Sequence, residues 1–473
     1  MASTAVPDIR ALRARFEEFD QGHVLRFWNQ LAPEARQQLA AQAAALDLPA
    51  LLRGYRATQQ EGRGAPKIEA PEVEALPEFG GSAERRAEAR ARGEALLREG
   101  RVALMVVAGG QGSRLGFAGP KGLYPLGPVT GRTLFALQAQ RIRRLRERTG
   151  AAIPWYVMTS EATDDATRSA FAEAGHFGLP PRDVFFLRQG MITSFDFDGK
   201  LILERPDRIF VNPDGHGGSL TALLASGALD DMERRGITTI FYYQVDNPLI
   251  EIGDRVLLGF HAQVGAQVSC KSLRKREPEE KMGVFARIDG RIGVVEYTEI
   301  TPEQRDARER SSGRLLFDAG NLAVHAFQVD FVRAVAAEAE RWLPWHASAK
   351  KIPTIDASGA PVEPDQPNGL KLERFVFDAL RAAQQVCIVE AARDEYGPVK
   401  NAEGGDSPSS SRRALSARYR RWVEDAGLRA PSPAHQIEID ETRIGGPDDL
   451  RALGVTAVEQ AREHIHTRLG DDA

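Results

Sequence analysis

Residues 106–116 read Val-Val-Ala-Gly-Gly-Gln-Gly-Ser-Arg-Leu-Gly, and Pro-Lys-Gly follows at 120–122. An apolar stretch of strand length leads here directly into glycines and then into basic side chains. Glycine lets a backbone turn sharply and brings its N–H groups close to an anion. We therefore predict a loop that binds the phosphates of a nucleotide at the carboxyl edge of a parallel sheet. Its backbone donors would be Gly109, Gly110, Gln111 and Gly112, and Arg114 and Lys121 would add positive charge.

Two better-known phosphate loops do not fit this stretch. If Gly110 and Gly112 begin the dinucleotide pattern GxGxxG, its third glycine falls on Leu115. The P-loop needs Gly-Lys followed by Ser or Thr, and no such tripeptide occurs nearby. Both patterns are excluded, and a tight turn that uses glycine for shape alone is the remaining alternative.

The sequence downstream of residue 100 alternates between strand-like and helical segments. Apolar runs rich in β-branched or aromatic residues lie at 102–108, 153–159, 184–187 and 239–245, and helical patterns lie at 133–148 and 163–174. Continuous rather than alternating apolar runs are typical of strands buried on both faces. The pattern predicts an α/β fold with a mostly parallel sheet covered by helices.

Three regions are predicted along the chain. Residues 1–99 form an N-terminal helical region, which includes a helix from Pro33, and residues 100–385 form the α/β domain that contains the glycine-rich loop. Residues 386–473 form a small C-terminal α+β subdomain. Its predicted elements are a helix near Arg412–Ala426, a strand at Gln436–Ile439 and a final helix that ends near Leu469.

Composition excludes several classes of protein. The 473 residues include 62 Lys and Arg against 66 Asp and Glu, so the formal net charge of -4 lacks the basic excess of a nucleic-acid binder. No apolar run reaches the roughly 20 residues that span a bilayer, and the N-terminus shows no secretory signal. The two cysteines lack CxxC spacing, which argues against a zinc site or a disulfide framework. We predict a cytoplasmic protein with no nucleic-acid or membrane partner.

The run at 108–142, AGGQGSRLGFAGPKGLYPLGPVTGRTLFALQAQRI, resembles the signature of the UDP-sugar pyrophosphorylases, which are uridylyltransferases. The resemblance is closest to the eukaryotic-type UDP-N-acetylglucosamine pyrophosphorylases. Further matches occur in family order from roughly residue 20 to 410, among them FFLRQGM at 185–191, NPDGHGG at 212–218, YYQVDNPLI at 242–250 and ARDEYGPVKNAEG at 392–404. The resemblance implies a Rossmann-like nucleotidyltransferase domain.

The resemblance also implies the reaction. UTP and a sugar 1-phosphate would give UDP-sugar and pyrophosphate, and the sugar phosphate oxygen itself would attack the α-phosphorus. Asp246, which follows an apolar stretch, would hold Mg²⁺ or Mn²⁺, because Mg²⁺ prefers one or two carboxylates plus phosphate oxygens. A turn-forming Asp is the alternative for this residue. Arg114, Lys121 and Lys400 would neutralise phosphate charge, with Lys400 at the sugar phosphate.

The same comparison implies the base and sugar contacts. Gln189 would hydrogen-bond uracil, and Gly215 would lie against it. The sugar would contact His216, Gly283, Glu296 and Asn321, with Phe375 and Phe377 near its pocket. The two phenylalanines, at i and i+2, could not both face one side of a helix, so ordinary core packing stays open for one of them.

Position 216 departs from the N-acetylglucosamine pattern, in which Asn is usual, and follows relatives that make UDP-glucose or a broader range of UDP-sugars. We expect N-acetylglucosamine 1-phosphate as the substrate. Glucose 1-phosphate or broad specificity is the alternative, and a non-catalytic sugar-nucleotide binding protein is a remote one. A monomer or a weak homo-oligomer is expected.

Overall fold

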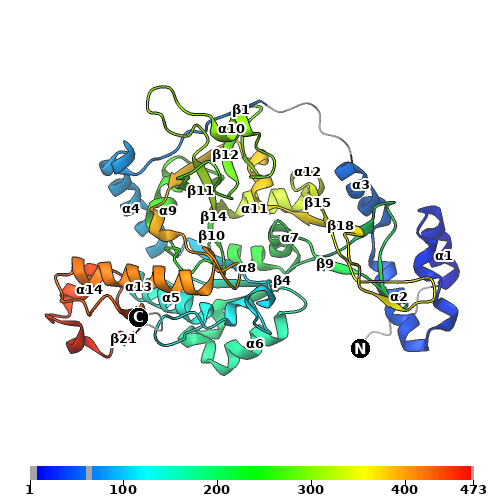
Figure 1. Ribbon diagram of the computed structural model, residues 1–473, viewed down its shortest axis with the longest axis horizontal. Helices are drawn as coiled ribbons and strands as arrows, with labels where there is room; N and C mark the ends of the chain where they lie inside the picture. Colours follow the sequence, from blue (N-terminus) through cyan, green and yellow to red (C-terminus); the bar gives the residue numbers. More distant parts are fainter. Residues whose placement is uncertain (1–7, 60–66, 470–473) are drawn as a thin grey trace. The chain divides into compact units, whose positions relative to one another are not determined.

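The computed structural model describes residues 8–59 and 67–469, which form two compact units (Figure 1). The first unit combines the described residues before 60 with residues 189–221 and 338–379. The second unit combines residues 67–188, 222–337 and the described chain from 380 onward. Each unit is assembled from segments that lie far apart in the sequence. The predicted boundaries at 99 and 385 stay a prediction.

A ten-stranded sheet forms the centre of the second unit. Four neighbouring strands are parallel, in the order β10 (Thr239–Gln244), β2 (Val102–Val107), β3 (Trp155–Thr159) and β4 (Val184–Arg188). The strand β14 (Ala319–Gln328) continues the sheet antiparallel to β10. The remaining strands are β1 (Ile68–Glu69), β11 (Val268–Arg274), β12 (Val284–Ile288), β13 (Arg291–Val295) and β19 (Val386–Glu390). The predicted α/β fold is confirmed, and antiparallel strands extend the parallel centre of the sheet.

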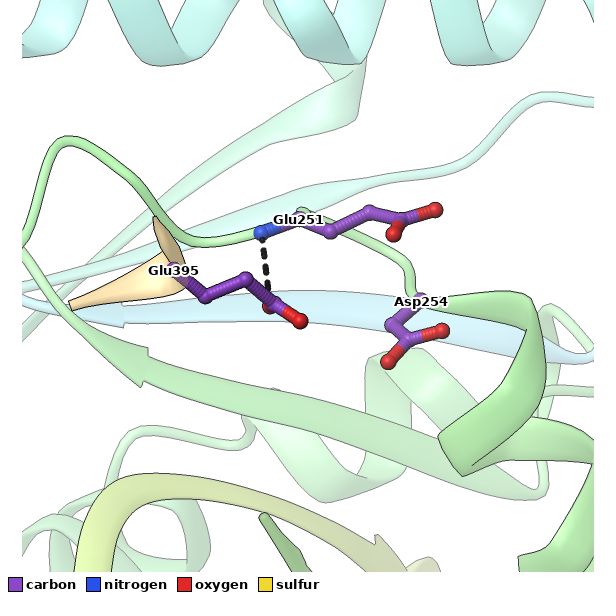
Figure 2. Close-up of side chains that lie close together, drawn as sticks. All are labelled: Glu251, Asp254 and Glu395. Atoms are coloured by element: carbon purple, nitrogen blue, oxygen red, sulfur yellow. Dashed lines mark hydrogen bonds between the residues drawn. The ribbon is translucent and has the colours of Figure 1, made fainter. Parts of the chain in front are cut away.

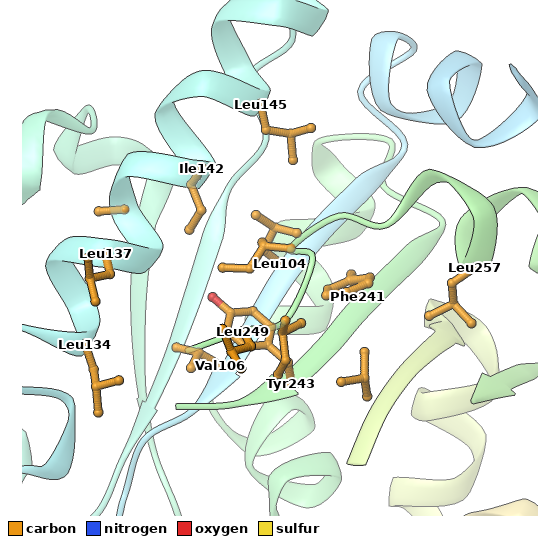
Figure 3. Close-up of a cluster of buried hydrophobic side chains, with 14 of the residues drawn as sticks. Leu104, Val106, Leu134, Leu137, Ile142, Leu145, Phe241, Tyr243, Leu249 and Leu257 are labelled. Carbon is orange, nitrogen blue, oxygen red and sulfur yellow. The ribbon is translucent and has the colours of Figure 1, made fainter. Parts of the chain in front are cut away.

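The core of the second unit explains the continuous apolar runs of the sequence. Every residue of β3 is buried, as is all of β2 up to Val106. Leucines and an isoleucine of α5 (Leu134–Thr149) pack toward the sheet, where Phe241 and Tyr243 lie (Figure 3). The helices α4 (Ala83–Arg98) and α9 (Arg255–Gln263) pack closely, since a Cβ on Gly93 or Gly259 would overlap backbone of the other helix.

The other helices of this unit vary in length from 5 to 18 residues. They are α6 (Asp164–Glu173), α8 (Ala228–Arg234), α10 (Pro302–Asp306), α11 (Val329–Ala337), α13 (Pro408–Asp425) and α14 (Pro447–Ala452). Among the described residues, none of the helices combines the length and apolarity needed to cross a bilayer.

The C-terminal segment differs from its prediction in one element. The helix predicted near Arg412 is α13, and the predicted strand is β20 (His435–Ile439). The predicted final helix near Leu469 is wrong, because residues there form β21 (Ile465–Leu469), which pairs antiparallel with β20. Pairing gives both strands cross-strand hydrogen bonds, and Ile465 is buried in the main core.

Helices and short strands make up the first unit. Its helices are α1 (Ile9–Glu18), α2 (Pro33–Ala45), α3 (Leu48–Gln59) and α12 (Ala339–Trp342), so the predicted helix from Pro33 is confirmed. The helix α7 (Gly218–Ala225) spans the point in the sequence, after Thr221, at which the chain leaves the first unit. A three-stranded sheet of β15 (Trp345–Lys350), β18 (Gly369–Arg374) and β6 (Phe195–Asp196) shares a separate core with α1 to α3. Two-stranded pairs are β5 (Met191–Thr193) with β9 (Val211–Pro213), β7 (Leu203–Arg205) with β8 (Arg208–Ile209), and β16 (Thr354–Ile355) with β17 (Pro361–Val362).

Candidate functional site

The glycine-rich loop begins where β2 ends. The Ser160 hydroxyl donates to the Gly109 carbonyl at 2.7 Å, and the Lys121 N–H donates to the Gly110 carbonyl at 3.0 Å. Gly110 is exposed, and a Cβ there would meet nothing within 4 Å. By contrast, a Cβ on Gly112 would lie 2.8 Å from the Phe117 ring. The Gly112 N–H donates to the Gly119 carbonyl at 2.8 Å.

The glycines of this loop therefore divide into two kinds. Gly112 shapes the loop, because packing excludes a side chain there and its N–H is already donated within the loop. Gly110 and Gln111 are exposed, and Gly109 is half-buried. Arg114 lies exposed on the short 3₁₀ turn Ser113–Leu115. The contacts of Gly109, Gly110, Gln111 and Gly112 with a nucleotide stay a prediction.

Lys121 and Asp246 come together at the carboxyl ends of two adjacent strands. Parallel pairing of β2 with β10 places the loops that follow these strands at one edge of the sheet. The Lys121 Nζ lies 3.7 Å from the Asp246 Oδ2, and their side chains are 18% and 16% exposed. A cation and a carboxylate from segments 125 positions apart thus share one partly shielded place, as the loop pattern predicts.

A cavity of about 220 Å³ adjoins Asp246 within the second unit. Residues predicted to bind the metal, the sugar or the sugar phosphate line it from four segments: Asp246, Gly283, Glu296, Asn321 and Lys400. Its remaining walls include Lys281, Tyr297 and Tyr396. The structure therefore brings together five residues that the sequence placed in one site.

Gly283 makes room for the carboxylate of Glu296. A Cβ on Gly283 would lie 3.0 Å from the Glu296 Oε1 and 2.9 Å from Val294. The Asn321 N–H donates to the Gly283 carbonyl at 2.8 Å, which ties β14 to this wall. The Asn321 Oδ1 accepts from the Ala323 N–H at 2.9 Å. An amide and a carboxylate side by side suit a ligand with several hydroxyl groups.

The segment that carries Lys400 is tied to the Asp246 loop by backbone contacts. The Val399 N–H donates to the Asp246 carbonyl at 2.8 Å. The Asn247 amide donates to the Glu395 carbonyl at 2.9 Å and accepts from the Gly397 N–H at 3.3 Å. Asn247 therefore holds the two loops in register, a role that sequence reasoning missed although the residue stands beside Asp246.

Three oxygen-bearing side chains act on the ammonium of Lys400. Its Nζ donates to the Tyr396 hydroxyl at 3.4 Å and pairs with Asp406 at 3.3 Å. Burial alone would lower the pKa of Lys400, but Tyr396, Asp406 and Asp246 raise it above its ordinary value. The side chain is therefore charged at neutral pH, as a phosphate contact requires. Tyr396 was missed as well, although it lies in the same quoted stretch.

Gln189 and Gly215 meet in the first unit at one end of the β5–β9 pair, where Gln189 precedes β5 and Gly215 follows β9. The Gln189 amide donates to the Gly215 carbonyl at 2.6 Å. Gly215 has a φ of +87°, and a Cβ there would overlap the backbone carbonyl of Arg374 on β18. Packing against β18 thus already requires this glycine. The predicted contacts of both residues with uracil stay a prediction.

His216 lies against two aromatic rings of the first unit, which also contact each other. Its ring stacks on Phe375 with centroids 5.3 Å apart and an angle of 16°, and Phe377 lies 5.7 Å away. The Val376 N–H donates to the His216 Nδ1 at 3.1 Å, so the proton of the neutral ring is on Nε2. Burial lowers the pKa of His216 to about 4, which agrees with a residue that performs no acid–base chemistry.

The expectation that Phe375 and Phe377 lie together in one helix is wrong. Phe375 lies directly after β18, before the 3₁₀ segment Val376–Ala382, rather than inside an α-helix. The turn of the chain at this point lets both rings contact His216. Phe375 also stacks on His346, with centroids 4.2 Å apart.

Three acidic side chains, Glu251, Asp254 and Glu395, lie close together near the segment that carries Lys400 (Figure 2). The Lys271 ammonium pairs with Asp254 at 2.6 Å and with Glu395, and its side chain is only 1% exposed. Asp254 also accepts from the Val256 N–H at 2.8 Å, as the N-cap of α9. Asp254 and Glu395 therefore form an ion-pair network around the buried Lys271, with the exposed Glu251 beside it, separate from the predicted metal ligand.

A glycine loop after the first strand of a parallel sheet, a carboxylate at the adjacent strand end and a sugar-sized cavity together define a nucleotidyltransferase. The profile of the family described as UTP–glucose-1-phosphate uridylyltransferase matches residues 54–439. The chain belongs to this family of enzymes.

Individual relatives are similar over most of their length. The human UDP-N-acetylhexosamine pyrophosphorylase-like protein 1 is 41% identical over 88% of this chain and 86% of its own. UDP-N-acetylglucosamine diphosphorylase 2 of Arabidopsis thaliana is 36% identical over 90% and 86%. The crystal structure of the Trypanosoma brucei uridine diphosphate N-acetylglucosamine pyrophosphorylase with an inhibitor has a TM-score of 0.77 at 28% identity, covering 90% of this chain and 87% of that one.

Proposed function

We propose that the enzyme makes UDP-N-acetylglucosamine and pyrophosphate from UTP and N-acetylglucosamine 1-phosphate. The cavity beside Asp246 carries this proposal, because it gathers a carboxylate, an amide and a lysine around a space of about 220 Å³. The names of the relatives support an N-acetylated hexosamine as the sugar.

The residues would act by position and charge. Glu296 and Asn321 would bind sugar hydroxyls, which orients the phosphate oxygen for attack. Lys400 would hold the sugar phosphate, while Lys121 and Arg114 would stabilise the charge on the triphosphate and on the departing pyrophosphate. Phosphoryl transfer needs no protein nucleophile, since the sugar phosphate supplies the attacking oxygen.

Pyrophosphate release, measured for each nucleoside triphosphate with a panel of sugar 1-phosphates, tests the proposal. We expect UTP with N-acetylglucosamine 1-phosphate to give the highest kcat/KM. A higher value with glucose 1-phosphate would favour the alternative of a UDP-glucose or broad-range enzyme. No release with any pair would favour the remote alternative of a binding protein.

A divalent cation fits the Asp246 carboxylate. Mg²⁺ commonly takes one or two carboxylates together with substrate phosphates, and the Asp246 Oδ2 lies beyond hydrogen-bond distance from the Lys121 ammonium. When bound, the cation would neutralise phosphate charge. Asp246 would hold it, beside the Lys121 ammonium. We propose Mg²⁺ as this cation, with Mn²⁺ as the alternative.

We expect Asp246→Asn to raise the Mg²⁺ concentration needed for half-maximal activity by at least about tenfold, since a neutral amide is a weaker ligand for a hard cation. Activity is measured against Mg²⁺ and Mn²⁺ concentration. Asp406→Asn, which changes a carboxylate paired with Lys400 at 3.3 Å, is the matched control and should leave the metal requirement near that of the wild type. Full wild-type activity in excess chelator would contradict the metal role.

The sugar alternative rests on His216. A neutral ring whose Nδ1 accepts from Val376 offers one N–H, whereas Asn offers a carbonyl and an NH₂ together. If residue 216 faces the C2 substituent, His216→Asn should shift kcat/KM toward N-acetylglucosamine 1-phosphate over glucose 1-phosphate by about tenfold. The ratio is measured for both sugars on both proteins.

His346→Asn is a suitable control for that experiment. His346 also stacks on Phe375, at 4.2 Å, and pairs with Asp378 at 2.7 Å, but it has no predicted sugar contact. An unchanged ratio in His216→Asn, or an equal shift in His346→Asn, would mean that position 216 does not select the sugar. The cytoplasmic location and the monomeric or weakly oligomeric state stay predictions.

A further inference from the structure

Asp214 is a buried carboxylate that precedes Gly215 in the turn from β9 to α7. The residue is 7% exposed. Its N–H donates to the Gly190 carbonyl at 3.0 Å, and its own carbonyl accepts from the Arg374 N–H at 2.7 Å. The backbone of Asp214 is therefore fixed on two sides, by the β4–β5 loop and by β18.

Two glycines leave the space in which this carboxylate lies. A Cβ on Gly190 would come 2.6 Å from the Asp214 Oδ2, and a Cβ on Gly218, the first residue of α7, would overlap the Asp214 Oδ1. Neither glycine has a positive φ, so conformational freedom does not explain them. The close approach of the Asp214 side chain does explain them.

The same carboxylate contacts the amide of Gln189. A hydrogen bond from the Gln189 side chain lowers the pKa of Asp214, and the Gln189 amide nitrogen also donates to the Gly215 carbonyl at 2.6 Å. An ionised carboxylate and a backbone carbonyl are both acceptors only. Together they attract the NH₂ group of Gln189 and leave its Oε1 on the opposite side.

We propose that Asp214 is a positioning residue that fixes the orientation of the Gln189 amide and thereby selects uracil over cytosine. The inference rests on the proposed function, in which Gln189 contacts the base. An outward Oε1 accepts from the N3–H of uracil, whereas N3 of cytosine is itself an acceptor. A site built on one orientation of the amide leaves the wrong base with an unpaired polar edge.

The charge of Asp214 is costly to the fold. Burial raises the pKa of Asp214 to about 6, although Gln189 and Arg374 act in the opposite direction. Within the described chain, the Asp214 Oδ1 has no hydrogen-bond partner. A group whose pKa is raised on folding loses stability as pH rises through that value. A buried carboxylate that lowers the stability of the fold indicates a role in function rather than in stability.

The other charged groups near this turn come from β18 and α12. The charge of Arg374 lowers the pKa of Asp214, and the charge of Glu340 acts on Arg374, while Glu373 pairs with Lys371 at 2.9 Å. His216 is neutral, because burial lowers its pKa to about 4. Protonation of Asp214 near pH 6 therefore adds a donor to a cluster of acceptors around Gln189. That donor permits the flipped amide, which favours cytosine.

The test compares UTP with CTP as substrates at saturating sugar phosphate, from about pH 5.5 to pH 8. In the wild type, the UTP-to-CTP ratio of kcat/KM should rise with pH through about 6. Asp214→Asn can donate as well as accept, so its ratio should be at least about tenfold lower at pH 8 and flat with pH. Its melting temperature should equal or exceed that of the wild type.

Asp196→Asn is the matched control, since Asp196 is another carboxylate of the first unit and accepts from the Lys200 N–H at 2.8 Å. Its ratio and pH profile should match those of the wild type. A wild-type ratio and profile in Asp214→Asn would overturn the inference while leaving UTP turnover, and hence the proposed function, intact. Dissociation constants of UTP and CTP for the same proteins decide the inference even if turnover fails.

Discussion

Replacing Lys121 with alanine should lower kcat/KM for UTP by about a hundredfold or more while the protein stays folded. The Lys121 Nζ lies 3.7 Å from Asp246, at the junction of the glycine loop and the cavity that gathers the sugar residues. The Lys121 ammonium is already in place before the reaction, so it stabilises the charge that develops on the triphosphate without moving. Its loss should therefore raise the energy of the transition state most. Lys121→Arg should recover only part of the rate, because a planar guanidinium cannot replace a compact ammonium in a fixed place.

Lys67→Ala is the control for this substitution. Lys67 is 77% exposed in the second unit and pairs with Glu69 at 2.7 Å, so its loss removes an equal charge from an open surface. We expect its kcat/KM to stay within about twofold of the wild type, and exposed pairs contribute little to stability. A loss of less than about tenfold in Lys121→Ala, with an unchanged melting temperature, would remove Lys121 from its proposed role.

The buried centre of the fold could be predicted because its signal is local. The apolar runs of β2, β3 and β10 are continuous, and their burial on both faces follows from the same residues. The final helix failed because β21 is five residues long and its partner β20 lies some 30 positions earlier. Tertiary pairing, rather than local preference, decides the structure of such a segment.

The functional site likewise contains residues that could be predicted from local sequence and residues that could not. The glycine loop and the five residues of the cavity, Asp246 among them, could be placed together from sequence motifs, because each of these residues has characteristic neighbours in the sequence. Lys271 could not, because it reads as a polar residue in an ordinary strand and its partner Glu395 is 124 residues away. Asp214 stands inside a quoted motif, yet its contact with Gln189 depends on how β5 and β9 pair.

We expect Lys271→Met to destabilise the second unit by about 3–5 kcal/mol, the usual cost of removing one partner from a buried ion pair. Lys271 is 1% exposed, and Asp254 and Glu395 are 7% and 13% exposed. Burial alone would lower the pKa of Lys271, but the two carboxylates raise it, so the ammonium stays charged. Methionine fills the space of the lysine stem and leaves both carboxylates without a cation.

The pH dependence of the variant has a definite sign. Without Lys271, burial should raise the pKa of the remaining carboxyls above their unfolded values. Stability from a group with a raised pKa is present at low pH and is lost as pH rises through its folded value. The difference between the variant and the wild type should therefore be smaller near pH 5 than near pH 8, as measured by urea unfolding at both values.

Removing the charges of both carboxylates as well should restore much of the lost free energy of unfolding. Lys271→Met combined with Asp254→Asn and Glu395→Gln leaves no buried charge in the network, and replacing a whole buried cluster is far less costly than breaking it. The asparagine introduced at position 254 would still cap α9, because Asn is as good an N-cap as Asp. The rate of hydrogen exchange at the α9 and β11 amides should be higher in the single variant than in the wild type, and lower again in the triple variant. Equal stability of Lys271→Met and the exposed-site control Lys67→Met would show that the network contributes nothing to the fold.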